Sequence, residues 1–179
     1  MFLGAGKLLE KGFSAWKGAK NVDEIFDATT ASNKVKGNFG EIKAADNLVN
    51  NKKVKEAGYD LARIGDDAPT GLDDTIKKGI DGLYENANPP PKFVIDEAKY
   101  GTSQLGKTKD GKQMSDGWVL GEKTGNNRLV DQVGEVKAKE IERAMSKGQV
   151  EKVLSKIDAN GNVVTKRLDS AGKVIGNWP

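Results

Sequence analysis

The sequence predicts an α/β domain in which helices flank a mixed β-sheet, with a helical N-terminal lead-in and a C-terminal β-hairpin. Three observations predict this class. Apolar residues recur at helical spacing early in the chain, two central segments are rich in β-branched and aromatic residues, and a Gly-containing turn is repeated near the end. We expect a lead-in over residues 1–33 and one domain over 34–179, with its C-terminal helices and hairpin in 133–179.

The N-terminal elements are predicted to be helical. Phe2–Trp16 carries an apolar stripe that packs on the core or on a neighbouring module of a longer chain, or else contacts a membrane. Residues 21–26 begin with capping residues and predict a second, short helix, and the polar residues 29–33 connect it to the domain. Asn38–Val49 predicts a third helix, in which Glu41 borders the buried face.

The central segments predict strands. Asp60–Ile64 predicts a short strand, and Lys78–Tyr84 and Phe93–Tyr100 are rich in residues that favour strands. Asn86–Lys92 contains three prolines and must be a turn or loop. We therefore expect the two longer strands to be neighbours in one sheet.

The C-terminal half begins with a loop rich in glycine and lysine. A short helix is predicted over Gln113–Leu120, and two helices over about Glu135–Met145 and Gln149–Lys156, separated by Gly148. In the tail, Ile157–Val163 is echoed by residues 168–174, and both copies place a Gly-containing turn before a valine. This repeat predicts a hairpin or short meander, whose open edge a partner strand could extend.

The composition is typical of a globular domain and excludes several kinds of chemistry. Of the 179 residues 36% are hydrophobic, and no stretch approaches the roughly 20 apolar residues of a membrane span, so we expect no stable membrane insertion. The absence of cysteine and histidine excludes disulfides, cysteine zinc sites and His-dependent catalytic triads. A metal would be held by carboxylates, carbonyls and water, which favours Mg²⁺ or Mn²⁺ over Zn²⁺.

Glu97 and Lys99 form the first candidate site. Side chains alternate across a strand, so these two residues share one face of the predicted strand Phe93–Tyr100. A carboxylate that holds a metal and a lysine that orients water suit the hydrolysis of a phosphodiester. The same spacing is also common in exposed ion pairs, so the pair alone does not decide the function.

Asp81 strengthens this hypothesis. It lies in a strand-like run, and an antiparallel pairing with Phe93–Tyr100 brings it beside Glu97. Two neighbouring, half-buried carboxylates are costly unless a cation neutralises them. The alternative is that Asp81 is a surface acid beside a turn.

These residues together resemble a known superfamily. Glu41, Ile80-Asp81-Gly82 and Asp96-Glu97-Ala98-Lys99 are similar to the motifs of the PD-(D/E)xK superfamily, although Ile80 stands where that family often has proline. The resemblance implies a restriction-endonuclease-like core over about residues 36–120. It also implies that Glu41, Asp81 and Glu97 are catalytic metal ligands and that Lys99 orients the attacking water.

A longer string narrows the resemblance. Residues 97–101, Gln104-Leu105 and 112–119 resemble the C-terminal toxin domains of bacterial contact-dependent growth inhibition and related polymorphic toxins. This implies the tip of a long secreted surface protein that acts in the cytoplasm of a competing bacterium. It also implies cleavage of tRNA or DNA there, and neutralisation by a cognate immunity protein.

Polar residues after the predicted site strand are further candidates. Gln104 and Ser115 could contact phosphate or position water, or be ordinary loop residues. Lys107, Lys109 and Lys112 could clamp a nucleic-acid backbone, or be solvated.

Two other functions stay open. A non-catalytic module that binds nucleic acid or protein would use the same charges as a network of salt bridges. An effector enzyme of another type has few mechanisms available, because the sequence lacks histidine, cysteine and a phosphate-binding Gly-rich signature. Trp118, flanked by Val119 and Leu120, is expected in the core rather than stacked on a base.

Overall fold

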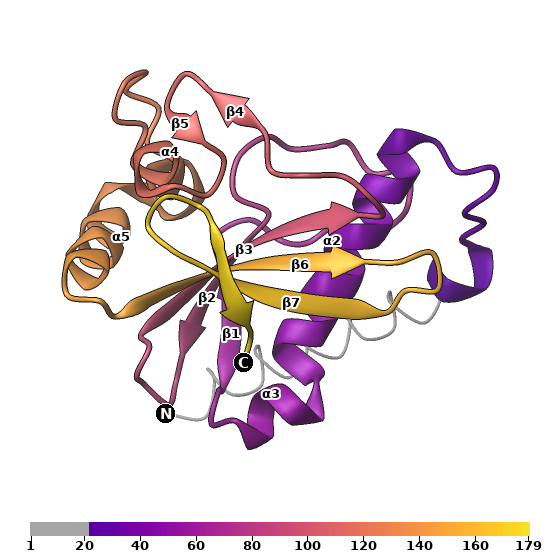
Figure 1. Ribbon diagram of the computed structural model, residues 1–179, viewed down its shortest axis with the longest axis horizontal. Helices are drawn as coiled ribbons and strands as arrows, with labels where there is room; N and C mark the ends of the chain where they lie inside the picture. The colour runs from indigo at the N-terminus through magenta and orange to yellow at the C-terminus, as the bar shows by residue number, and fades with distance from the viewer. Residues whose placement is uncertain (1–21) are drawn as a thin grey trace.

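The computed structural model describes residues 22–179 and confirms a mixed α/β fold (Figure 1). The predicted lead-in helix over Phe2–Trp16 lies outside the described residues. Six strands form one sheet in the order β1-β2-β3-β6-β7-β8, in which only the β3–β6 pair is parallel. The strands are β1 (Leu61–Ile64), β2 (Gly82–Asn86), β3 (Phe93–Tyr100), β6 (Val150–Ile157), β7 (Val163–Leu168) and β8 (Val174–Asn177). A separate two-stranded ribbon contains β4 (Lys107–Thr108) and β5 (Gly111–Lys112).

Strand β3 is central and is buried on both faces. Phe93 and Ile95 pack in one core cluster with Ile141, whereas Val94 packs in another with Leu48. This is the alternation that a strand imposes, and both faces are apolar because helices cover both. The strand has the bounds that the sequence predicts.

Helix α2 (Asn33–Asn50) covers the face of Val94 and runs past the C-terminal end of β3. It starts five residues before the predicted Asn38 because the hydroxyl of Ser32 accepts a hydrogen bond from the Val35 amide and caps it. A Cβ at Gly40 would lie 3.7 Å from the Cβ of Tyr100, so α2 lies close to β3. The other helices are α3 (Lys52–Glu56), α4 (Asp116–Leu120) and α5 (Arg128–Ser146), and residues 22–25 are also helical.

The predicted helix over Gln149–Lys156 is wrong, because this segment is strand β6. Its charged residues hide the strand pattern. Lys152 is only 6% exposed, and its Nζ lies 2.7 Å from Asp116 Oδ1 and donates to the carbonyl of Met114. An ion pair with a distant residue thus allows a lysine in the middle of the sheet. The sequence pattern instead predicts a solvent-facing position on a helix for this lysine.

Other boundaries also differ from the prediction, and α5 begins at Arg128 instead of at about Glu135 because the side chain of Asn127 caps it. Strand β2 begins at Gly82, so that Lys78–Asp81 lead into the strand instead of belonging to it. Helix α4 begins at Asp116 because the hydroxyl of Ser115 accepts from the Trp118 amide and caps the helix. The predicted helix starting at Gln113 is therefore too long at its N-terminal end.

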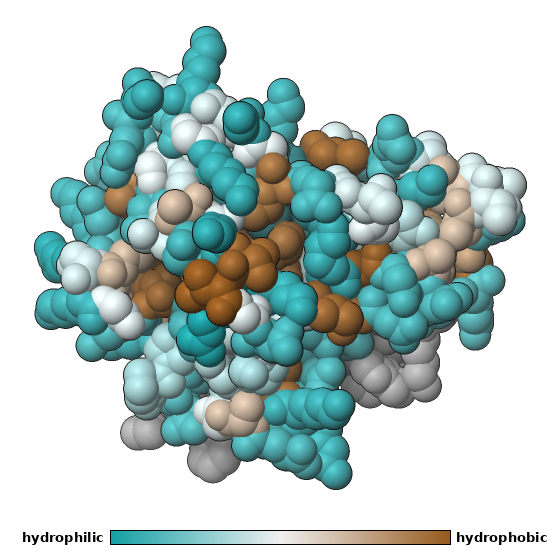
Figure 2. Space-filling model, viewed as in Figure 1, coloured by the Kyte–Doolittle hydropathy of each residue, from teal (hydrophilic) through white to brown (hydrophobic). Residues whose placement is uncertain are grey.

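The predicted meander at the C-terminus is confirmed by β6, β7 and β8. Asp158 and Asp169 each accept two backbone hydrogen bonds within their own turns, at the same relative positions. Strand β8 is an edge of the sheet, and the exposed Val174 and Ile175 lie on it, where Figure 2 shows an apolar area on the front face. Within residues 22–179 no helix is long and apolar enough to cross a membrane.

Candidate active site

The pairing of β2 with β3 places Asp81 opposite Glu97. Gly82 is the register partner of Asp96. Because the strands are antiparallel, Asp81, which precedes Gly82, lies opposite Glu97, which follows Asp96. Asp81 Oδ2 accepts a hydrogen bond of 2.9 Å from the Ala98 amide. The structure therefore brings these two carboxylates together, as the antiparallel pairing predicts.

Glu97 is the most constrained carboxylate of the group. Its Oε1 lies 3.2 Å from Lys99 Nζ and accepts a hydrogen bond from Gln113 Nε2. Its Oε2 is buried and has no hydrogen-bond partner among the described residues. A buried carboxylate oxygen without a donor is costly, which marks this atom as the position where a cation would be most stabilising.

Glu41 reaches the same place from helix α2. It lines one cleft together with Asp81, Glu97 and Lys99. Four side chains from three separate segments of the sequence therefore share one cavity. This is the arrangement that the superfamily resemblance implies for them.

The electrostatics of the three carboxylates point in one direction. Burial, followed by the negative charge of Asp81, raises the pKa of Glu41 to about 8. The same two causes raise the pKa of Glu97 well above its usual value. Burial raises the pKa of Asp81 to about 6, although its hydrogen bond from Ala98 and the charge of Lys99 act in the opposite direction. The group therefore has more negative charge than its protein surroundings stabilise.

These residues fit a hard divalent cation, but they do not form a ready cage for it. Among residues 22–179, no three carboxylates converge closely enough to form a metal cluster. Mg²⁺ commonly binds through only one or two carboxylates and keeps several waters. The adjacent Asp81 and Glu97, with the unpaired Oε2, provide such a pair, and Glu41 lies in the same cavity.

The cleft has a volume of about 1000 Å³ and two distinct walls. One wall comes from the N-terminal part of α2 and from residues 76–79, which precede β2. The other contains Gln113, Trp118, Asn126 and Arg128. In Figure 1, α2 and the α4–α5 pair lie on opposite sides of the sheet region that carries β3.

Several residues at the site have roles that the sequence did not predict. Asp96 is buried on the opposite face of β3 from Glu97, accepts a 2.7 Å hydrogen bond from Ser155 Oγ, and has a pKa that burial raises to about 7. Arg63 donates to the backbone oxygen of Asp81 and fixes the turn into β2. Gln113 belongs to residues 112–119, which carry part of the toxin resemblance, and this resemblance is the sequence feature that could have identified it. Nothing in the sequence singles out Arg63.

The five additional candidates do not line the cleft. Ser115 is committed to capping α4. The amide of Gln104 donates to the Thr102 carbonyl at the surface. The remaining three, Lys107, Lys109 and Lys112, are exposed on and around the β4–β5 ribbon. A role in binding outside the cleft remains a prediction for them.

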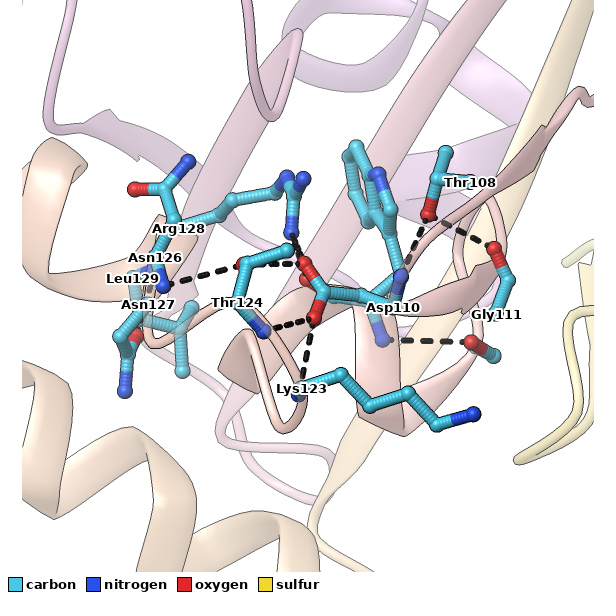
Figure 3. Close-up of polar contacts among 11 residues, drawn as sticks. Thr108, Asp110, Gly111, Lys123, Thr124, Asn126, Asn127, Arg128 and Leu129 are labelled. Carbon is cyan, nitrogen blue, oxygen red and sulfur yellow. Dashed lines mark hydrogen bonds and ion pairs between the residues drawn. The ribbon is translucent and has the colours of Figure 1, made fainter.

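A buried aspartate organises the wall around Arg128 (Figure 3). Asp110 accepts hydrogen bonds from the amides of Lys123 and Thr124, from the Thr124 hydroxyl, and from Arg128 Nη1 at 3.0 Å. These bonds, with that of the Thr124 side chain as the largest cause, hold the pKa of Asp110 far below its usual value. The Arg128 guanidinium lies 4.5 Å from the ring centre of Trp118, which is buried as predicted.

Comparisons of the chain with models of known families, with curated proteins and with solved structures give no match. The functional argument therefore depends on the site itself.

Proposed function

We propose that this chain is a metal-dependent nuclease domain that hydrolyses phosphodiester bonds of tRNA or DNA. The observation that carries the proposal is the position of Asp81 opposite Glu97, with Lys99 Nζ 3.2 Å from the Glu97 carboxylate and one Glu97 oxygen buried without a partner. This combination of two carboxylates and a lysine, at one end of a central strand and open to a cleft, suits metal-assisted hydrolysis. A restriction-endonuclease-like core is the fold that the motifs favour.

Each residue has a distinct part in this proposal. Asp81 and Glu97 would hold Mg²⁺ or Mn²⁺, or less favourably Zn²⁺, with Glu41 as a further ligand. The cation would supply Lewis-acid stabilisation of the charge that develops on the phosphate. Lys99 donates a hydrogen bond that orients the attacking water, and Gln113 fixes the Glu97 carboxylate that Lys99 contacts.

The biological setting in this proposal comes from the resemblance of residues 97–119 to contact-dependent growth inhibition toxins. The domain would be the C-terminal tip of a large secreted surface protein and would act in the cytoplasm of a competing bacterium. A cognate immunity protein would neutralise it. The open edge at β8, with Val174 and Ile175 exposed, is a candidate surface for that partner. Ile175→Asp is expected to weaken immunity-protein binding in a pull-down, and unchanged binding would exclude this edge.

A binding module without catalysis is the second candidate. The ion pair between Lys99 and Glu97 favours it, because the same contact serves a structural network of charges. Under this alternative, nucleic-acid binding survives Glu97→Ala and needs no divalent ion.

The deciding experiment incubates the purified domain with plasmid DNA and with total tRNA. Mg²⁺, Mn²⁺, Zn²⁺ and EDTA are compared for the wild type and for Glu97→Ala/Lys99→Ala. The matched control is Lys137→Ala/Glu140→Ala, which removes a 3.0 Å ion pair on α5 outside the cleft. Metal-dependent cutting that only the Glu97/Lys99 variant loses supports the nuclease and identifies its substrate. Intact nucleic acids in every sample would contradict it in favour of the binding module.

A further inference from the structure

Basic side chains lie on both walls of the cleft that holds the carboxylates. Lys36 on α2 and Lys77 and Lys78 before β2 line one wall. Arg128, at the start of α5, lines the other. The cleft therefore has a negative centre, at Asp81 and its neighbours, with basic side chains on both walls, and Asp131 of α5 also lies in its lining.

The lysine wall is held in a defined position. Asn38 Nδ2 donates to the carbonyls of Leu72 and Asp74, both at 2.8 Å, and ties this segment to α2. On the other side of the lysines, the Ile80 carbonyl accepts a 3.1 Å hydrogen bond from Gln132 Nε2. Residues 75–79 are thus fixed at both ends while their side chains stay accessible.

In the part of the chain that the structure describes, the lysines of this wall form no ion pair, although Glu41 and Asp74 line a small adjoining pocket together with Lys77. Lys77 and Lys78 are exposed, and within residues 22–179 neither they nor Lys36 forms an ion pair. Lys36 Nζ lies 6.0 Å from the ring centre of Tyr100, which also lines the cleft. Cations beside a cavity that are not held in ion pairs are available for a polyanion to neutralise on binding.

Arg128 presents its guanidinium differently. Its Nη1 donates to Asp110 and to the Trp118 carbonyl, and the group lies over the Trp118 ring. The N–H groups of Nη2 and Nε have no hydrogen-bond partner among the described residues. An arginine fixed by one nitrogen and by stacking, with its other donors free, is well prepared to bind a phosphate through two hydrogen bonds. Asp110 acts as its positioning residue.

We propose that one nucleic-acid strand lies along this cleft, with Lys36, Lys77 and Lys78 binding phosphate on one side of the carboxylates and Arg128 binding phosphate on the other. The inference rests on the proposed nuclease function for the identity of the ligand, but strand binding itself requires no catalysis. The proposal also assigns the main contacts with the nucleic-acid backbone to the cleft instead of to the β4–β5 ribbon. The ribbon lysines, Lys107, Lys109 and Lys112, lie outside the cleft.

The test measures binding of a fluorescein-labelled single-stranded oligonucleotide by anisotropy, in EDTA and over a range of salt concentrations. Lys77→Glu/Lys78→Glu is compared with Lys53→Glu/Lys55→Glu, an identical change of charge at exposed lysines of α3, which does not line the cleft. We expect the cleft variant to bind about tenfold more weakly or worse. The plot of log K against log salt has a negative slope, and loss of two phosphate contacts should make it less steep by about 1.4 for a single strand. The α3 variant should keep a slope near that of the wild type.

Arg128 is tested by two substitutions, because removal of its charge leaves Asp110 buried without its partner. Arg128→Lys keeps the charge but loses the planar fork, and circular dichroism shows whether Arg128→Gln still folds. Both are expected to weaken binding, and Arg128→Lys to raise KM for cleavage more than it lowers kcat. Wild-type binding by folded Arg128→Lys and Arg128→Gln would overturn the second phosphate contact.

Failure of this inference can be separated from failure of the proposed function. If the wild type cuts nucleic acid with a metal but the Lys77/Lys78 and Lys53/Lys55 variants bind equally, the strand path is wrong and the nuclease stands. If no metal supports cutting but the cleft variant alone loses binding, the strand path stands and the nuclease is wrong. Loss of binding only in a Lys107→Glu/Lys109→Glu variant would place the strand on the ribbon. Absence of binding by the wild type would overturn the inference as well.

Discussion

Ser155 Oγ donates a 2.7 Å hydrogen bond to Asp96 Oδ1, and both side chains are buried within the sheet. Burial nevertheless raises the pKa of Asp96 from 3.8 to about 7. The folded state therefore holds the Asp96 proton more tightly than the unfolded chain does. The stability gained from this proton is complete below about pH 4 and is lost as the pH rises to about 7.

We therefore expect the metal-free wild type to lose stability relative to Asp96→Asn between about pH 4 and pH 7. Each unit of pKa shift corresponds to about 1.4 kcal/mol of unfolding free energy. Urea unfolding in EDTA at several pH values measures the difference, with the exposed Asp73→Asn as the control. Parallel pH profiles for the wild type and Asp96→Asn would contradict the role of this buried carboxyl.

Divalent metal is expected to raise the thermal midpoint of the wild type. A cation bound between Asp81 and Glu97 relieves the repulsion of the buried carboxylates, and binding at about a hundredfold excess over Kd adds about 2.7 kcal/mol. Glu97→Gln should abolish most of this increase. It should itself be more stable than the wild type in EDTA at neutral pH, because burial raises the pKa of Glu97 and an uncharged amide avoids this cost of the folded state. Scanning calorimetry with Mn²⁺ and with EDTA checks both expectations. The exposed Glu140→Gln should respond to metal as the wild type does, and an equal response of Glu97→Gln would place the metal elsewhere.

Gly172→Ala is expected to destabilise the protein more than Gly125→Ala does. Both glycines have positive φ, +76° and +77°, so the backbone strain is matched. A Cβ at Gly172 would lie 2.8 Å from the Gln113 carbonyl, whereas at Gly125 it would meet no atom within 4 Å. Thermal unfolding of the two variants should therefore separate steric clash from strain. Because Gln113 contacts Glu97, we also expect Gly172→Ala to reduce cleavage, and equal midpoints for the two variants would exclude the clash.

Asp110→Asn is expected to lower the thermal midpoint at neutral pH and to change the acid sensitivity of folding. The pKa of Asp110 is lowered in the folded state, chiefly by the Thr124 side chain and then by backbone and Arg128 donors. The resulting stability is present above the ordinary pKa of 3.8 and is lost as the pH falls below it. The difference in thermal midpoint between the wild type and Asp110→Asn should therefore become smaller as the pH falls. Thermal unfolding at several pH values measures it, and a constant difference from pH 7 to pH 3 would show that the carboxylate charge adds no stability.

The sequence predicts those parts of the fold that depend on local pattern. Strand β3 has the expected bounds because it opens with the aromatic and β-branched residues Phe93, Val94 and Ile95, which are buried on both faces, and ends at another aromatic residue, Tyr100. The C-terminal meander follows from the turn chemistry of Asp158 and Asp169, which act within their own segments. Asp81, Glu97 and Lys99 meet in one cleft because strand register and alternation are simple periodicities, and Glu41 joins them because α2 packs against β3.

The remaining features depend on contacts between distant segments. The local sequence of strand β6 predicts a helix because it does not reveal Asp116, the distant partner against which Lys152 is buried. Gln113 and Arg128 enter the cleft only through the path of the long connection after β3. The same path carries Lys107 and its neighbours away from the cleft, which the lysine-rich composition of this segment alone does not predict.

The connection from β3 to the parallel strand β6 supplies a whole wall of the cleft, including Gln113, Trp118 and Arg128. All four motif residues, Glu41, Asp81, Glu97 and Lys99, precede this connection in the chain. The four motif residues and this wall of the cleft thus come from successive parts of the sequence. If the proposed function is correct, replacement of residues 101–149 is expected to change which substrate the cleft accepts while the four motif residues keep their positions.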